Sequence, residues 1–351
     1  MRVSKLLTVL LAIFLVVGLS LQATAGNPNK KGTAGAEELL IPMGARGTAL
    51  AGAAAANITG IDAIYWNPAG LASTQAGVEA MFSYMTYIAD INIAYGAVGV
   101  KTTLGSIGLS FQSLAFGDIA VTTEDAPNGT GSFYSPTYMT VGATYSRAMT
   151  DRIFVGVNLK FIHETIMQST ANTFALDMGV QYLTDLGVRL GVLLKNFGAP
   201  IKFDGENLDR QVDLQDVPPG TPQRRLRFPG EKAELPSSFE IALAYDIKPI
   251  EKFSASVMAS VRTQNFMNDQ LLAGLELGYN DMFFLRGGYD YGFNEGEDIM
   301  GNSTYLWGPT FGFGLKLPIT GTMKLAFDFA YRLTMESYFD NNMLFTAKFV
   351  F

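Results

Sequence analysis

The chain has 351 residues, a formal net charge of −7, no cysteine and a single histidine. An acidic chain without a basic face is a poor candidate for nucleic-acid binding, and the missing cysteines exclude thiol catalysis and cysteine-based metal sites. Hydrophobic residues make up 48% of the chain and charged residues only 16%, against about 25% charged residues in soluble domains.

The N-terminus has the three-part layout of a secretory signal peptide. Arg2 and Lys5 supply the positive region, an apolar run extends from Leu6 to Leu21, and Ala23-Thr24-Ala25 forms a small-x-small cleavage pattern. The run is short for a membrane-spanning helix, which needs about 20 residues. We therefore predict that residues 1–25 are a signal peptide cleaved on export, with a retained anchor helix as the alternative.

Residues 26–77 show no alternation of apolar and polar side chains. The stretch from Gly44 to Ala56 is rich in glycine and alanine and is compatible with a helix. Further on, Asn67 precedes Pro68, which favours an extended residue followed by a turn or a helix start. These features predict a compact N-terminal element that precedes the rest of the fold.

From residue 78 to residue 351 the sequence alternates with a period of two. In the segment 323–333, for example, Phe327, Phe329 and Tyr331 share one face, while Asp328 and Arg332 share the other. A helix would mix these two sets because its period is 3.6, whereas a strand separates them. The segments are around ten residues long, which is the length that a tilted strand needs to cross a bilayer.

Fourteen such segments are predicted. The connections after the third, seventh and eleventh segments are long (116–136, 198–237 and 293–307), and those after the even-numbered segments are short. Long and short connections at opposite ends are typical of outer-membrane barrels. The prediction is therefore an all-β transmembrane antiparallel up-and-down β-barrel of about 14 strands over residues 78–351. Residues 26–77 form a small helical plug, because a barrel of this size encloses more space than its wall side chains fill.

Polar side chains on the inward face of these segments are candidates for the lining of the lumen. They are Lys160, Arg189, Lys195, Arg286, Asp290, Lys324, Asp328 and Arg332. Pairs that neutralise each other across the wall are the simplest interpretation, and a polar lining that holds the plug or contacts cargo is the functional one. Aromatic residues at segment ends, such as Tyr87 and Tyr279, are predicted to form interface girdles.

The sequence offers little for catalysis. A hydrolase needs a nucleophile and a base, and the alternation places the single histidine, His163, on the lipid side with Phe161. Without further histidines or any cysteine, a zinc site is not expected. The acidic residues between 204 and 216 match no metal-binding loop. We therefore predict no enzyme, no cofactor and no metal site.

Several strings resemble one family of outer-membrane proteins. Residues 38–72, which include Ile41-Pro42-Met43-Gly44-Ala45-Arg46-Gly47 and Tyr65-Trp66-Asn67-Pro68-Ala69-Gly70-Leu71, resemble the start of PorV/PorQ-family proteins, which belong with the FadL-like barrels. The likeness continues in residues 194–201, in residues 286–293 and in the terminal Phe351. The string Asn67-Pro68-Ala69 is also similar to the plug motif of FadL-like transporters.

This resemblance implies a 14-stranded barrel with an N-terminal hatch whose motif is Tyr65, Trp66, Asn67, Pro68, Ala69 and Gly70. PorV-like members handle type IX secretion cargo by binding the C-terminal signal domains of exported proteins. FadL-like members pass hydrophobic compounds across the outer membrane, which is the alternative function. The expected partners are outer-membrane lipid, the barrel assembly machinery through the strand ending at Phe351, and either secreted proteins or hydrophobic small molecules.

Overall fold

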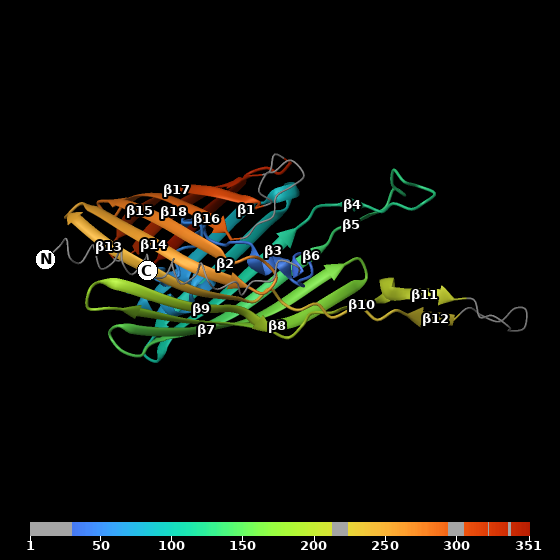
Figure 1. Cartoon of the computed structure of the whole chain (residues 1–351), viewed down its shortest axis with the longest axis horizontal. Coiled ribbons are helices and arrows are strands. Elements are labelled where there is room, and N and C mark those ends of the chain that lie inside the picture. Colours follow the sequence, from blue (N-terminus) through green and yellow to red (C-terminus); the bar gives the residue numbers. More distant parts are fainter. Residues whose placement is uncertain (1–29, 213–223, 294–304, 322, 336–337) are drawn as a thin grey trace, which may run out of the picture.

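The computed structural model describes residues 30–212, 224–293, 305–321, 323–335 and 338–351, so the predicted signal peptide lies outside the described residues. Fourteen antiparallel strands form a barrel, and β1 pairs with β19 to close it (Figure 1). The predicted strand number is confirmed. The strands are β1 (Val78–Thr86), β2 (Asn92–Thr102), β3 (Gly105–Ala115), β6 (Thr137–Ala148), β7 (Ile153–Ile166), β8 (Ser169–Leu183), β9 (Val188–Gly198), β13 (Ser238–Ile250), β14 (Phe253–Gln264), β15 (Gln270–Tyr279), β16 (Phe283–Gly292), β17 (Trp307–Thr320), β18 (Met323–Thr334) and β19 (Asn342–Val350). Among the described residues, no helix has the length and apolar character needed to cross a membrane.

The apolar face of each strand points outward. Phe327 on β18 is 44% exposed, whereas its neighbour Asp328 is 5% exposed and faces the lumen. Phe329 packs between Phe313 and Phe345, with ring centroids 5.4 and 5.0 Å apart. The predicted assignment of faces is confirmed, and the outward aromatic and aliphatic side chains form the surface that lipid contacts in a membrane barrel.

The two ends of the barrel differ. At one end, here called the turn end, short turns join the strands, and Phe351 pairs with Val78 through its backbone N–H. At the other, the loop end, the long connections carry two hairpins that project beyond the barrel (Figure 1). One is β4 (Ile119–Ala120) with β5 (Phe133–Tyr134), and the other is β11 (Asp209–Val212) with β12 (Arg224–Arg227). The connection that holds the second hairpin also contains β10 (Phe203–Gly205), which pairs with β8, and the turn η6 (Glu206–Leu208). These segments are too short for their alternation to predict them as strands.

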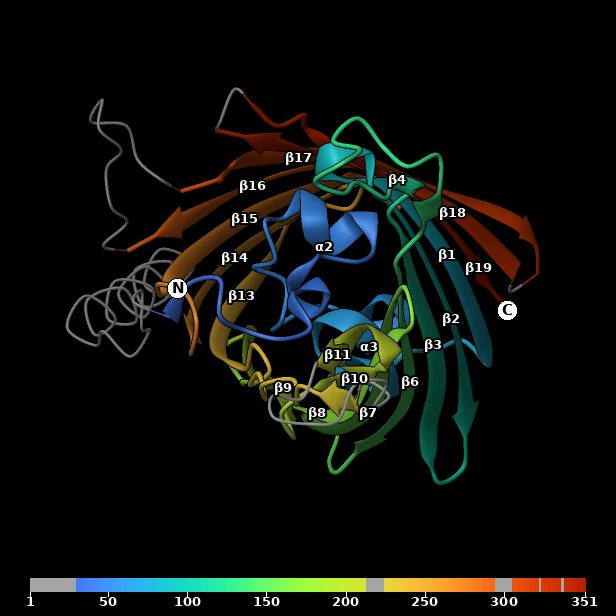
Figure 2. The same cartoon turned by 90° about the vertical axis from the view of Figure 1, so that its right-hand side faces the viewer.

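Residues 30–77, called the plug from here on, lie inside the barrel (Figure 2). The plug consists of short helices: η2 (Glu37–Leu40), α2 (Ala45–Ala49), η3 (Gly60–Asp62), α3 (Ala63–Trp66) and η4 (Pro68–Ser73); a further turn, η5 (Ile88–Asp90), joins β1 to β2. The helix expected over the glycine- and alanine-rich stretch covers only Ala45–Ala49. It stops there because Ala51 and Gly52 have φ angles of 52° and 82°, a left-handed conformation that cannot continue a right-handed helix.

Glycines on the inward face of the wall let the plug backbone touch the strands. A Cβ atom on Gly156 would come within 3.0 Å of Pro68, one on Gly191 within 3.0 Å of Ala55, and one on Gly288 within 3.0 Å of Leu50. Real side chains do not tolerate such contacts. The glycines of β7, β9 and β16 therefore decide where the plug can lie.

We expect the outward assignment to be visible in folding energetics. Phe327→Arg, near the middle of β18, should destabilise the folded barrel in lipid vesicles by about 2–4 kcal/mol, because it places a charge in the hydrocarbon layer. Tyr279→Arg, on the same outward face but at the turn end of β15, should cost at most about 1 kcal/mol. Urea titrations in vesicles would measure both, and equal costs at the two positions would show that the depth assignment is wrong.

Candidate functional site

A cavity of about 810 Å³ lies in the barrel between the plug and the loop end. Aromatic side chains from distant parts of the chain line it: Tyr65, Trp66, Tyr87, Phe116, Tyr138, Phe203, Tyr305 and Trp307. Aliphatic side chains such as Leu39, Ile41 and Leu114 fill the spaces between them. Polar and charged side chains stand among them, but apolar side chains are the majority. A concave, mainly apolar pocket with polar groups in its wall has the character of a small-molecule site.

The predicted plug motif divides into two parts with different surroundings. Tyr65 and Trp66 face the cavity, where their rings meet edge to face with centroids 5.0 Å apart. The Tyr65 hydroxyl donates a hydrogen bond of 2.7 Å to the carbonyl of Ile41. Trp66 occupies space that the missing side chain of Gly47 leaves free. This half of the motif forms the floor of the cavity.

The other half of the motif, from Asn67 to Gly70, packs within the plug and against the wall, where the Asn67 side chain lies against Gly179 of β8. Asn67 is fully buried, and its amide donates to the carbonyl of Ala55 over 2.8 Å. Its side-chain oxygen accepts from the backbone N–H of Ala69 and caps η4, as asparagine commonly does at a helix start. Gly70 packs against the carbonyl of Ile58. These residues hold the plug in place and do not line the cavity.

Of the eight predicted lumen residues, three line the cavity: Lys195, Asp290 and Arg332. The Lys195 ammonium lies 3.7 Å from the centroid of the Tyr65 ring and 5.9 Å from that of Trp66, so it makes cation–π contacts with the floor. Arg332 stacks on Trp307, with its guanidinium carbon 3.5 Å from the ring centroid, and it lies 3.7 Å from Asp290.

The other five predicted lumen residues lie elsewhere in the barrel. Lys160 pairs with Asp177 at 2.7 Å, and Arg189 pairs with Asp246 at 3.0 Å near the turn end. Lys324 is exposed at the turn end. Arg286 and Asp328 belong to a buried charge chain below the cavity. Lys160, Arg286 and Asp328 are buried inside the barrel. Alternation carries no information on the height of a side chain in the barrel.

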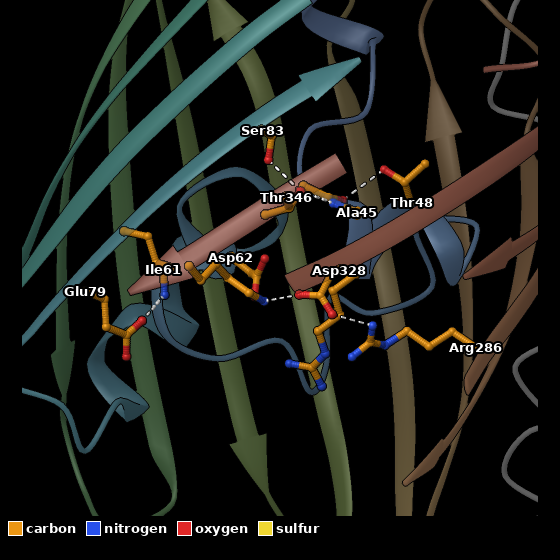
Figure 3. A network of polar contacts seen from close by, with 12 residues as sticks. Ala45, Thr48, Ile61, Asp62, Glu79, Ser83, Arg286, Asp328 and Thr346 are labelled. Atoms are coloured by element: carbon orange, nitrogen blue, oxygen red, sulfur yellow. Dashed lines mark hydrogen bonds and ion pairs between the residues drawn. The ribbon is translucent and has the colours of Figure 1, made fainter. Parts of the chain in front are cut away.

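The buried charge chain joins the plug to the four strands β15, β16, β18 and β19, and Figure 3 shows its members Asp62, Asp328 and Arg286. Arg46 of the plug contacts Glu276 through two hydrogen bonds of 3.0 Å. Arg286 lies 2.6 Å from both Glu276 and Asp328. Lys348 completes the chain, at 2.7 Å from Asp328 and 2.6 Å from Asp62 of the plug. Three acids and three bases alternate, so the chain is neutral and both of its ends belong to the plug.

Uncharged contacts reinforce this attachment. The backbone N–H of Ala45 donates to the hydroxyl of Thr346, and the hydroxyl of Thr310 donates to the carbonyl of Ala49. The carboxylate of Glu79 accepts from the backbone N–H of Ile61 over 2.5 Å. Figure 3 shows Ala45 beside Thr346 and Ile61 beside Glu79. The plug is thereby bonded to strands on both sides of the β1–β19 seam.

The structure corrects one expectation about the aromatic residues. Tyr279 is 45% exposed on the outward face, as a girdle residue should be, but Tyr87 packs against the interior and its ring lies 6.1 Å from that of Trp307. Tyr87 directly follows β1, where the alternation of the strand no longer fixes the side of the next residue. His163 lies on the outward face as predicted, because its neighbours Ile162 and Glu164 are inward and buried.

We expect the charge chain to contribute strongly to stability. Lys348→Met should destabilise the folded barrel by about 3–5 kcal/mol, because it leaves Asp62 and Asp328 buried without their shared partner. Adding Asp62→Asn should recover part of this loss. The exposed Lys324→Met provides the matched control and should change stability by no more than about 0.5 kcal/mol. Urea unfolding in vesicles would measure all three, and equal effects of the two lysine variants would contradict a structural role for the chain.

No protein-family model matches this sequence, and no curated protein matches it in sequence. Solved structures do share its fold. The CymD monoaromatic hydrocarbon channel superposes with a TM-score of 0.54 at 11% identity, over 89% of this chain and 98% of its own. The Pseudomonas putida toluene transporter TodX gives 0.55 at 12% identity, over 88% and 96%. The Ralstonia pickettii toluene transporter TbuX gives 0.54 at 10% identity, over 88% and 97%. At these identities the similarity shows a shared barrel fold.

Proposed function

We propose that this protein is an outer-membrane channel through which hydrophobic small molecules enter the lumen from the loop end. The observation that carries the proposal is the aromatic and aliphatic cavity of about 810 Å³ on the loop side of the plug. Two further points support it: the FadL-like character of the plug motif, and the barrel fold shared with proteins described as monoaromatic hydrocarbon channels and toluene transporters.

The cavity suits an apolar ligand for a simple physical reason. Most of its lining consists of carbon-rich side chains that water solvates poorly, and a ligand that covers them gains roughly 25 cal/mol for each Å² removed from water. At the cavity edge, Arg262 pairs with Glu240 at 2.8 Å and Arg332 with Asp290 at 3.7 Å. A hydrocarbon can therefore lie beside these groups without separating either ion pair.

On this proposal the plug must move for transport. Its core residues Ala45, Leu50 and Ala53 have no exposed surface, so the cavity ends at the plug. The loop end would face the cell exterior and the turn end the periplasm, in keeping with the usual arrangement of long and short connections. The cavity would then be a capture site, and release would follow displacement of the plug.

A role in protein secretion is the second candidate. It rests on the PorV/PorQ resemblance of residues 38–72, 194–201 and 286–293, and on the two hairpins that project from the loop end. Both hairpin regions expose large apolar side chains, with Phe133 65% and Phe228 58% exposed. Loops on a rigid scaffold commonly carry recognition, so these hairpins are where signal domains of secreted proteins would bind.

Ligand capture can be measured directly, because both tryptophans of the chain, Trp66 and Trp307, line the cavity. Nitrobenzene, a monoaromatic quencher, should reduce the tryptophan emission of the nanodisc-embedded protein with saturation. Ala34→Phe should weaken this quenching, since residue 34 lines the cavity. Ala120→Phe, on the exposed β4 strand, is the control and should behave as wild type. If quenching rose linearly with nitrobenzene concentration, without saturation and equally in the wild type and both variants, nitrobenzene would have no binding site in the cavity.

A deletion strain separates the two candidate functions. If the protein is a channel, cells without it should take up toluene or long-chain lipids more slowly, while proteins with C-terminal signal domains still reach the cell surface. Growth on hydrophobic carbon sources and the periplasmic content of such proteins are the two measurements. Normal hydrophobic uptake with secreted proteins trapped in the periplasm would exclude the channel and favour the secretion role.

A further inference from the structure

Two buried carboxyl groups meet at the wall of the cavity. Glu38 belongs to the turn η2 of the plug, and Glu164 belongs to β7. Both side chains line the cavity, and the two residues are only 5% and 3% exposed. Tyr138 lies opposite Glu164 in the register of β6 and β7, so an aromatic ring borders the pair.

These carboxyl groups have no protein partner to neutralise them. Among the described residues, no donor group of the protein bonds either oxygen of Glu38 or Oε1 of Glu164, and each carboxyl group has only the other beside it. The amide of Gln112 approaches Glu38 but donates to its backbone carbonyl, over 3.3 Å. Thr140 lies opposite Gln112 in the strand register, is 6% exposed, and its hydroxyl also has no partner. Buried charges without partners are costly, so this cluster is incomplete as it stands.

Burial, reinforced by the charge of Glu164, raises the pKa of Glu38 to about 8. The titratable groups that act on Glu38 are Glu164, Glu37 of the same turn, and Tyr138. Because the two carboxyl groups interact strongly, they titrate as a pair.

The other buried charges around the cavity are compensated. Arg262 is paired with Glu240 and Arg332 with Asp290. Lys195 lies over the Tyr65 ring, which offers its ammonium a favourable electrostatic contact. Within the described cavity wall, the Glu38–Glu164 pair is therefore the place where a positively charged group of a ligand would bind most favourably.

We propose that the cavity takes amphiphiles with an apolar body and a protonated amine, with the amine between Glu38 and Glu164. This inference rests on the proposed channel function and narrows its substrate class. An ammonium offers three donors, enough to bond both carboxyl groups, and charge-assisted hydrogen bonds of this kind are stronger than neutral ones. The apolar body would lie along Leu114, Phe116 and Tyr138, which line the adjacent wall.

The test is displacement of nitrobenzene from the nanodisc-embedded protein, followed as recovery of tryptophan emission. Three ligands share one hydrocarbon body: 4-phenylbutylamine, 5-phenylpentanoate and butylbenzene. The amine should displace nitrobenzene at a concentration at least about tenfold lower than the carboxylate. Its advantage should grow as the pH rises from about 6 to about 9, since Glu38 loses its proton while an alkylammonium stays charged.

Variants locate the effect. Glu38→Gln and Glu164→Gln should each reduce the preference for the amine while butylbenzene binds as before. Glu124→Gln, at an exposed carboxylate that does not line the cavity, is the control and should keep the preference. If butylbenzene displaces nitrobenzene but the carboxylate competes as well as the amine, the amine site is wrong and the channel function stands. If none of the three ligands displaces nitrobenzene, both proposals fail.

Discussion

The closed interior of a fourteen-stranded barrel imposes the constraint from which the other features follow. Wall side chains cannot fill so wide a lumen, and any chain that fills it brings backbone polar groups that need partners. The plug meets this requirement by lying directly on wall glycines and by bonding to inward side chains. Gln181, for example, donates to the carbonyls of both Ala55 and Ile58. Irregular backbone is thus buried without being left unsatisfied.

The buried charged side chains of the lumen also need partners. An isolated ion in the lumen wall would be costly, but Asp62, Lys348, Asp328, Arg286, Glu276 and Arg46 alternate in sign along one continuous chain. A buried ion pair adds little net stability over an apolar contact, yet it strongly disfavours any arrangement that separates its members. The main effect of this charge chain is therefore to fix the position of the plug in the barrel. It specifies where α2 and η3 of the plug stand relative to β15, β16, β18 and β19.

The cavity is what remains once the plug is held at the turn-end side. Trp66 and Tyr65 connect the two regions, because their rings form the cavity floor while the next residue, Asn67, is bonded to Ala55 within the plug. A displacement of the plug would move the cavity floor at the same time. On the proposed channel function, ligand occupancy would therefore be coupled to the position of the plug.

The sequence by itself determined the fourteen strands of the barrel wall and their inward and outward faces, because a period of two is a local property that each long strand displays on its own. It also marked the residues of the plug motif and the inward position of Lys195, Asp290 and Arg332. Only the tertiary structure decided which inward charges meet. Arg46 and Glu276 are 230 residues apart in the chain, and no local pattern encodes the height at which plug and strand come together. The pairing of Glu38 with Glu164 arises in the same way, since it depends on how the plug passes β7, and the inward turn of Tyr87 depends on the path of the chain after a strand has ended.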